Sequence, residues 1–243
     1  EKMATQEIIS EIISQPDGSD VNDEAGHRYG NFPNYYSFHG VDERLDCIPE
    51  GLIVECFGLK NLTEGSTFTI CDIGCNDGTL TWELHKRIDR IIRSFNPLHS
   101  LRTLGLDIDP ILIQRAKETF IKDRSEVSAE VTVESSTSSS ISFDVVNVSN
   151  FEHVSTVVDS FLGLQEANSF NLVTCFSTTM WVHINNGDTA MKKFLKQLAS
   201  FSRNIVIEPQ PWKCYRNAAT RLRRQGLPAL THFHDIIARS SEG

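Results

Sequence analysis

The sequence lacks the patterns of a membrane protein and of a metal site. No apolar stretch reaches about 18 residues, the length that a transmembrane helix needs, so we expect no membrane span. The chain opens without the pattern of a cleavable signal peptide. Its six cysteines form no CxxC pair. We therefore expect free intracellular thiols and no bound metal.

A surplus of positive charge is also missing, since 32 acidic residues outnumber 23 basic ones and give a net charge of −9. The acids are concentrated at the start, where residues 1–24 hold seven acids and one base and so carry −6 of that charge. Five cations with no acid among them follow near the other end: Lys213, Arg216, Arg221, Arg223 and Arg224. The overall charge therefore hides a local basic surface that suits an anionic partner.

The length of 243 residues suits one large α/β domain or two small ones. We expect residues 1–25 to be an acidic tail without fixed structure and residues 26–243 to form one domain. Five short strands are predicted inside it, at 67–74, 101–108, 141–148, 169–177 and 204–208. Helical segments separate them, and this alternation predicts a doubly wound, Rossmann-like parallel sheet with right-handed crossovers. In such a sheet the ligand lies beyond the carboxyl ends of the strands.

Helical spacing appears in the segments around these strands. Residues 41–58 have it with a break at Pro49, and residues 79–95 place their apolar side chains on one face. Asp109 and Pro110 suit the N-cap and the first position of a helix that continues over residues 111–121. Two more helices are predicted over residues 187–201 and over the basic stretch 213–225.

The exit of the first strand is the most informative segment. It reads DIGCNDG, a close variant of the D-x-G-x-G-x-G pattern. Gly74 lets the backbone approach a ligand, and Asn76 is the best replacement for glycine where φ is positive. A dinucleotide site would need G-x-G-x-x-G instead. The spacing favours S-adenosylmethionine, whose cationic amino-acid end suits Asp72, although an ordinary strand–turn–helix connection would also give this pattern.

The second strand supplies an acid at the matching place. It ends in Asp107, and a carboxylate there can accept hydrogen bonds from both ribose hydroxyls of the cofactor. Asp109 follows two residues later, where it is better used as the helix cap. The two strand exits together therefore predict a nucleoside-binding edge.

Five segments of the chain together resemble one known family. They read YGNFPNYYSFH, DIGCNDG, GLDIDP, TTMWVHINNGD and VIEPQPWKCYR. In this combination, residues 28–235 resemble the bicoid-interacting-protein-3 family of RNA methyltransferases. The resemblance implies a class I S-adenosylmethionine-dependent methyltransferase that acts on the 5′-terminal phosphate of RNA. It also leads us to expect a monomer located in the cytoplasm, with the nucleus as the alternative.

Two details point to one branch of that family. Met180 before Trp181, and the run PWKCYRNAATRLRRQGL, resemble enzymes that methylate 5′-monophosphate ends. The substrates of that branch are histidine tRNA and precursor microRNA. The other branch caps the triphosphate of a small nuclear RNA. The resemblance therefore implies a tRNA or small RNA with a 5′-phosphate as partner.

The resemblance also implies roles for single residues. Arg44 is expected to reach the cofactor from the N-terminal side. Asn147 and Val148, at the end of the third strand, are expected to frame the adenine. Phe176 and Ser177, at the exit of the fourth strand, are expected to lie near the transferred methyl group. Surface, turn or core roles are the plain alternatives for residues of these types.

Methyl transfer to a phosphate needs little chemistry from the protein. The phosphate oxygen is already anionic and nucleophilic, so no general base is required, and the protein has to place donor and acceptor in line. We expect His183, Lys213 and Arg216 to hold the phosphate, because cationic side chains make charge-assisted hydrogen bonds to it. A structural hydrogen bond for His183 and a solvated basic helix are the alternatives. Trp212 offers a surface for a stacked base, whereas Glu208 has no partner that the sequence identifies.

The end of the sequence departs from the usual pattern. Methyltransferases with this sheet normally add a sixth and a seventh strand as a hairpin, and LPALTHFHDIIARSSEG does not have that pattern. We therefore expect the hairpin to be absent and the fifth strand to form an exposed edge. Two other functions stay open at this point. One is an RNA- and cofactor-binding protein with impaired turnover, and the other is a small-molecule methyltransferase.

Overall fold

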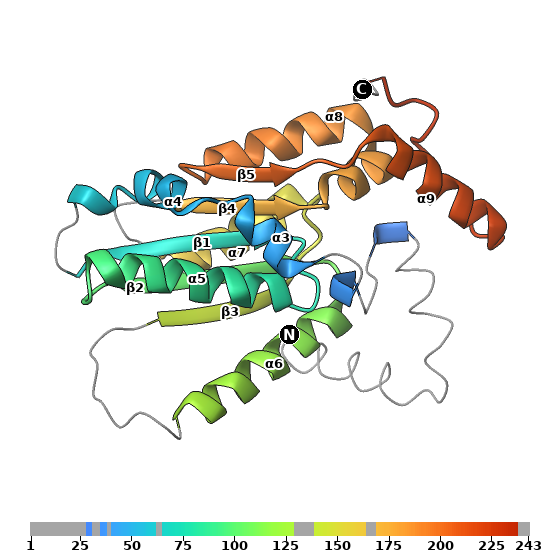
Figure 1. Cartoon of the computed structure of the whole chain (residues 1–243). Helices are drawn as coiled ribbons and strands as arrows, with labels where there is room; N and C mark the ends of the chain where they lie inside the picture. The colour runs from blue at the N-terminus through green and yellow to red at the C-terminus, as the bar shows by residue number, and fades with distance from the viewer. Residues whose placement is uncertain are drawn as a thin grey trace.

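The computed structural model describes residues 28–30, 35–37, 40–61, 65–128, 139–163 and 169–237. These residues form three layers, with helices on both faces of one parallel sheet (Figure 1). The predicted acidic tail at 1–25 lies outside the described residues. Within the described ranges, no helix combines the length and the apolar character that crossing a bilayer requires.

Five strands make up the sheet, and every neighbouring pair is parallel. They are β1 (Thr67–Ile73), β2 (Ser100–Asp107), β3 (Ser139–Val145), β4 (Leu172–Phe176) and β5 (Ile205–Glu208), in the spatial order β3-β2-β1-β4-β5. The predicted doubly wound sheet is confirmed. Within the described part of the chain no strand follows β5, so β5 forms one edge of the described sheet.

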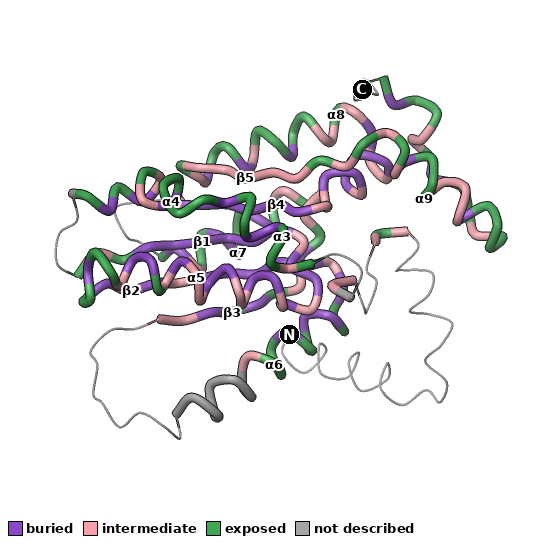
Figure 2. Tube along the Cα trace, viewed as in Figure 1, coloured by how far each residue is buried: buried purple, intermediate pink, exposed green. Residues whose placement is uncertain are grey.

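Burial falls from the centre of the sheet to this edge. In β1 every residue after Thr67 is buried, and β4 is buried throughout. The residues of β5 are only half-buried, which Figure 2 shows as a pink strand beside purple ones. β-branched and apolar side chains on both faces explain the central strands, because helices cover both sides of them.

Two sets of helices cover the two faces. α3 (Val41–Asp46), α4 (Glu50–Cys56) and α5 (Thr79–Phe95) pack with β1 on one face, next to short 3₁₀ turns at η1 (Tyr35–Ser37) and η2 (Leu59–Asn61). α7 (Phe151–Leu162) and α8 (Thr179–Ser200) pack on the opposite face. α6 (Pro110–Ser128) packs on β3, and α9 (Trp212–Arg224) lies beyond the carboxyl ends of the strands (Figure 1).

Most predicted helices are confirmed, with two differences. The bounds of α5 agree with the prediction, Pro49 is the N-cap of α4, and the Asp109 carboxylate accepts a hydrogen bond from the Ile111 amide at 2.8 Å. α7 was not predicted. α8 begins at Thr179 rather than at residue 187, because the chain stays helical on both sides of a kink at Gly187, where φ is +79°.

The strand order creates the place for a ligand. β1 leads into α5 on one face, whereas its neighbour β4 leads into α8 on the other. The two exits therefore diverge and leave a crevice at the switch point of the sheet, where open α/β sheets bind their ligands.

Candidate active site

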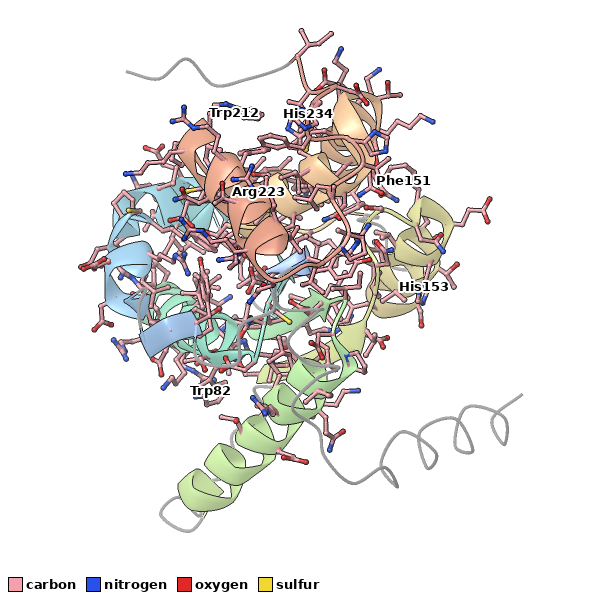
Figure 3. All side chains as sticks on the ribbon, turned by 90° about the vertical axis from the view of Figure 1, so that its right-hand side faces the viewer. Trp82, Phe151, His153, Trp212, Arg223 and His234 are labelled. Atoms are coloured by element: carbon pink, nitrogen blue, oxygen red, sulfur yellow. The ribbon has the colours of Figure 1, made fainter. Side chains whose placement is uncertain are left out.

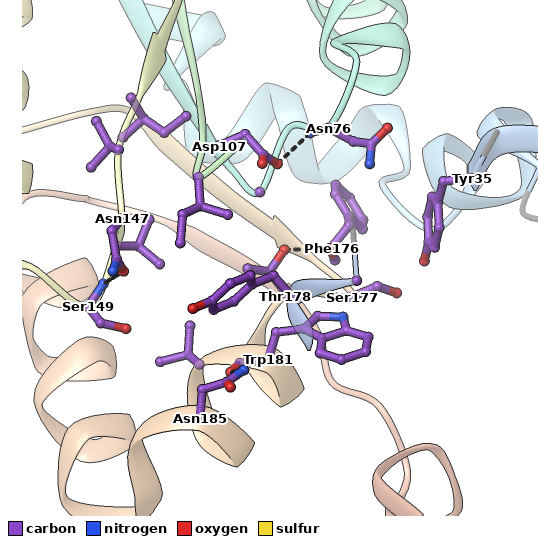
Figure 4. A pocket seen from close by; sticks show the side chains of 18 of the residues that line it. Tyr35, Asn76, Asp107, Asn147, Ser149, Phe176, Ser177, Thr178, Trp181 and Asn185 are labelled. Carbon is purple, nitrogen blue, oxygen red and sulfur yellow. Dashed lines mark hydrogen bonds between the residues drawn. The ribbon is translucent and has the colours of Figure 1, made fainter. Parts of the chain in front are cut away.

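A pocket lies beyond the carboxyl ends of β1, β2 and β4 (Figure 4). Its walls come from residues 28–30, from η1 and α3, from the strand exits and from the first turns of α8. The lining includes seven of the eight residues predicted to bind the cofactor: Arg44, Gly74, Asn76, Asp107, Asn147, Val148 and Phe176. The structure thus gathers residues spread over more than half of the chain around one cavity.

The β1–α5 loop forms one wall by approaching its neighbours closely. Gly74 has φ +75°, and a Cβ placed on it would lie only 1.9 Å from the Thr178 Oγ. Asn76 has φ +53°. The positive φ of Asn76 confirms the sequence interpretation of that position, and Gly74 also adopts the left-handed region. The loop backbone therefore forms part of the pocket wall itself.

Asp107 is held beside this loop. Its Oδ2 accepts a hydrogen bond from the Asn76 amide at 2.9 Å, and its Oδ1 accepts one from the Asp109 amide at 3.0 Å. Burial raises the pKa of the Asp107 carboxyl to about 6, although these backbone donors oppose the rise. Each carboxylate oxygen has two acceptor positions, so capacity for ligand hydroxyl groups remains on the pocket side.

Arg44 enters from the opposite side and is 7% exposed. Its Nη2 donates to the Tyr35 hydroxyl at 2.7 Å and to the Ser177 Oγ at 3.0 Å, and it forms an ion pair with Glu208 at 3.2 Å. The Ser177 hydroxyl in turn donates to the Glu208 Oε2 at 2.5 Å. Glu208, which had no partner from sequence alone, thus holds both Arg44 and Ser177.

Gln210 continues this support from the exit of β5. Its side-chain amide donates to the Ser177 carbonyl, and its Oε1 accepts a hydrogen bond from the Met180 amide at 3.2 Å. The segment after β5 therefore fixes both the end of β4 and the start of α8. Trp212 packs within the protein, stacked on Tyr215 and Phe233 with ring centroids 5.0 and 5.4 Å away. Its predicted role as a base-stacking surface does not match this packing.

Asp72 is the predicted cofactor residue that does not line the pocket. Its side chain is buried, and its two oxygens accept hydrogen bonds from the hydroxyls of Thr81 at 2.5 Å and Thr174 at 2.6 Å. Burial is the main reason that its pKa is raised to about 6. Asp72 thus connects β1 to β4 and to α5 beneath the crevice, which differs from direct contact with a ligand.

The three predicted phosphate-holding residues also lie outside the pocket lining. The His183 imidazole is buried, and its ring nitrogens lie 3.1 Å from the Tyr215 hydroxyl and 2.6 Å from the Asp188 carboxylate. The contact with Tyr215 joins α8 to α9, whereas the contact with Asp188 lies within α8. Lys213 and Arg216 are exposed on α9, and Arg216 lines a separate groove.

The pocket contains other residues that sequence reasoning did not assign to it. Trp181 and Asn185 come from α8, and Tyr29 and Gly30 come from the segment before η1. Gly30 lies so close to the indole that a Cβ on it would be 2.2 Å from Trp181. Both the YGNFPNYYSFH and the TTMWVHINNGD segments contributed to the family resemblance, but only tertiary packing shows that they contact each other.

Comparison with known proteins gives this pocket its context. A sequence model of the family described as bicoid-interacting protein 3 matches residues 170–237. The pre-miRNA 5′-monophosphate methyltransferase of Danio rerio is 37% identical over 213 residues, which cover 87% of this chain and 77% of that protein. The chain belongs to the bicoid-interacting protein 3 family.

Two further comparisons show lower similarity. The U6 snRNA methylphosphate capping enzyme Amus of Drosophila melanogaster is 26% identical over 80% of this chain and 57% of that protein. The chain is thus more similar to the 5′-monophosphate relative, as its sequence predicts. Among solved structures, the bifunctional kinase-methyltransferase WbdD aligns with 84% of this chain and 36% of its own, with 14% identity and a TM-score of 0.48. That likeness is too distant to say anything about the site.

Proposed function

We propose that this protein transfers a methyl group from S-adenosylmethionine to the 5′-terminal phosphate of RNA, with a monophosphate end as the preferred acceptor. One observation carries the proposal. In a chain 37% identical to a 5′-monophosphate methyltransferase, the pocket at the switch point gathers the residues that the family resemblance assigns to the cofactor. The residues that the family resemblance assigns to the cofactor are therefore residues of one pocket.

The residues present fit S-adenosylmethionine. Gly74 lets the loop backbone pack closely against Thr178 at the pocket wall, Asp107 has acceptor capacity for ribose hydroxyls, and Asn147 and Val148 line the pocket and are candidates to frame an adenine. Arg44 offers a buried cation at the other end of the pocket, where it suits the carboxylate of the cofactor. When bound, this cofactor supplies an electrophilic methyl group on a sulfonium.

The protein's own part in the reaction is positioning. Phe176 and Ser177 lie at the exit of β4 and line the pocket, between Asp107 and Tyr35 in the view of Figure 4. Arg28 lines the same pocket and brings a second cation to it. A phosphate oxygen needs no deprotonation, so charge-assisted hydrogen bonds that align it are sufficient. Trp181 and Tyr29 help to enclose this region and so to keep water out.

The test uses labelled cofactor and three versions of one RNA, with 5′-hydroxyl, 5′-monophosphate or 5′-triphosphate ends. We expect label in the monophosphate RNA and none in the hydroxyl RNA, because a site built for an anion is left with unpaired charge. Arg28→Ala should erode this preference, whereas Lys213→Ala, which alters an exposed residue outside the pocket, should keep it. Transfer to a small metabolite that RNA does not inhibit would overturn the proposal.

The remaining expectations are narrower proposals about the same enzyme. A tRNA or a small RNA as substrate, a monomeric state and a cytoplasmic location all follow from the family branch. Methylation of isolated cellular RNA, light scattering and cell fractionation would test them in turn. They stay predictions until those measurements are made.

A further inference from the structure

A groove separate from the pocket runs along α9. The chain turns at Gly226, where φ is +69°, and the Leu227 amide donates to the Leu222 carbonyl at 3.0 Å, which closes the helix. The following segment then returns along α9, so that the ring of Phe233 lies 5.4 Å from that of Trp212. A groove lies between the helix and the returning segment.

The lining of this groove has a particular chemistry. Arg216, Thr220 and Arg223 lie on one face of α9, at spacings of four and three residues. Small residues form part of the walls, namely Ala219, Gly226 and Ala229. His234 also lines the groove, and none of the described residues that line it is acidic. Cations beside a shallow apolar surface suit a ligand that is both flat and anionic.

We propose that this groove binds an unpaired nucleotide of the RNA, together with its phosphate, at a distance from the methylated end. The planar guanidinium group stacks on bases and forms bidentate hydrogen bonds with phosphate. The small residues leave room for a flat ring. The inference rests on the proposed function in one respect only, in that it takes RNA as the ligand.

The position of the groove agrees with this proposal. Trp181 of the pocket and Leu230 and Phe233 of the groove belong to one apolar cluster between α8, α9 and the returning segment. Figure 3 looks onto the side where the strands end, and α9 lies on this side with Arg223 facing the viewer. Arg223 follows Trp212 by eleven residues, or about 16 Å along the helix axis. Because the pocket and the groove border the same apolar cluster, we expect an RNA whose end enters the pocket to continue to the groove.

Two neighbouring arginines provide a matched comparison. Arg223 and Arg224 carry the same charge and are both exposed, but only Arg223 lines the groove. The probe is a fluorescent ten-nucleotide single-stranded RNA with a 5′-hydroxyl end, titrated without cofactor. We expect Arg223→Ala to weaken binding about tenfold, as for one lost charge-assisted hydrogen bond. Arg224→Ala should change it by about twofold or less, as for an exposed charge.

A second pair of variants tests the shape of the groove without changing charge. Ala229→Trp fills the groove, whereas Thr231→Trp alters an exposed residue that does not line it. We expect only Ala229→Trp to weaken RNA binding. Equal effects of the two arginine variants, or normal binding by Ala229→Trp, would overturn the groove proposal. Wild-type protein that does not bind this 5′-hydroxyl RNA would also overturn the groove proposal, but not the proposed function, which requires a 5′-phosphate. The proposed function fails instead if 5′-monophosphate RNA is not methylated, so the two failures are distinguishable.

Discussion

The pocket depends on a few side chains that each serve several parts of the chain. Ser177 is the clearest case. It has φ +51°, a conformation that a non-glycine residue adopts at a cost. Glycine would relieve that cost, but the Ser177 hydroxyl bridges Arg44 and Glu208, and its carbonyl accepts a hydrogen bond from Gln210. The hydroxyl bridge gives a physical reason to keep serine in a strained position.

The Asp107 carboxyl should make cofactor binding dependent on pH. Its pKa is raised to about 6, so it gains a proton as the pH falls through that value. Ribose hydroxyls need the charged acceptor, so affinity for S-adenosylhomocysteine should be constant above about pH 7. Below about pH 6 it should fall by up to about tenfold per pH unit. Calorimetry between about pH 5 and 8 measures this change.

Asp72 supplies the control for that titration. Burial raises its pKa to about 6 as well, but it does not line the pocket. Asp72→Asn should therefore keep the pH dependence of binding, while Asp107→Asn should remove it and bind weakly throughout. An affinity that does not change with pH in the wild-type protein would refute the role given to Asp107.

At the scale of elements, the helices and strands that could be predicted were those with a clear local sequence pattern. The strands were found because short β-branched runs stand between turn residues, and α5 was found from its one apolar face. α7 has buried valines at helical spacing, Val154 and Val158, but β-branched residues also suit a strand. The first turns of α8 were missed because Gly187 interrupts the helix.

The β1–α5 loop offers a test at this scale. Gly74→Ala should lower the free energy of unfolding by about 1–2 kcal/mol from its left-handed backbone alone, and by more because its Cβ would meet Thr178. Gly51→Ala in α4 is the matched control, since its Cβ meets nothing within 4 Å. It should stabilise the protein by up to about 1 kcal/mol. Chemical denaturation measures both changes, and equal effects would contradict the loop's proposed tightness.

On the scale of the whole molecule, the described sheet is most buried in its central strands β1 and β4 and less buried in its two edge strands, β3 and β5. Apolar clusters pack against both faces of β1 and β4. β5 pairs with β4 only, within the described residues, and is half-buried. This overall plan was predictable because it follows from the order of strands and helices. The arrangement of Arg28, Trp181 and Gly30 was not, because contacts between distant segments leave no local pattern.

Amide hydrogen exchange should report the difference in burial between the central strand β1 and the edge strand β5. We expect the amides of β5 to exchange faster than those of β1, because opening an edge strand exposes less apolar surface than opening a central one. Mass spectrometry of peptides from the two strands, compared at equal labelling times, would show the difference. Equal protection of the two strands would contradict the prediction that β5 opens more readily than β1.

The contacts of Arg44 also determine when the pocket can form during the synthesis of the protein. Ser177, which accepts its hydrogen bond, lies 133 residues later in the chain, and Glu208 follows later still. On the ribosome, α3 therefore emerges long before the groups that orient its arginine, and the closure of so long a loop is slow. The nascent chain cannot assemble its pocket until the segment after β5 has been made, so unfinished chains lack the contacts that hold Arg44 and Ser177 in place.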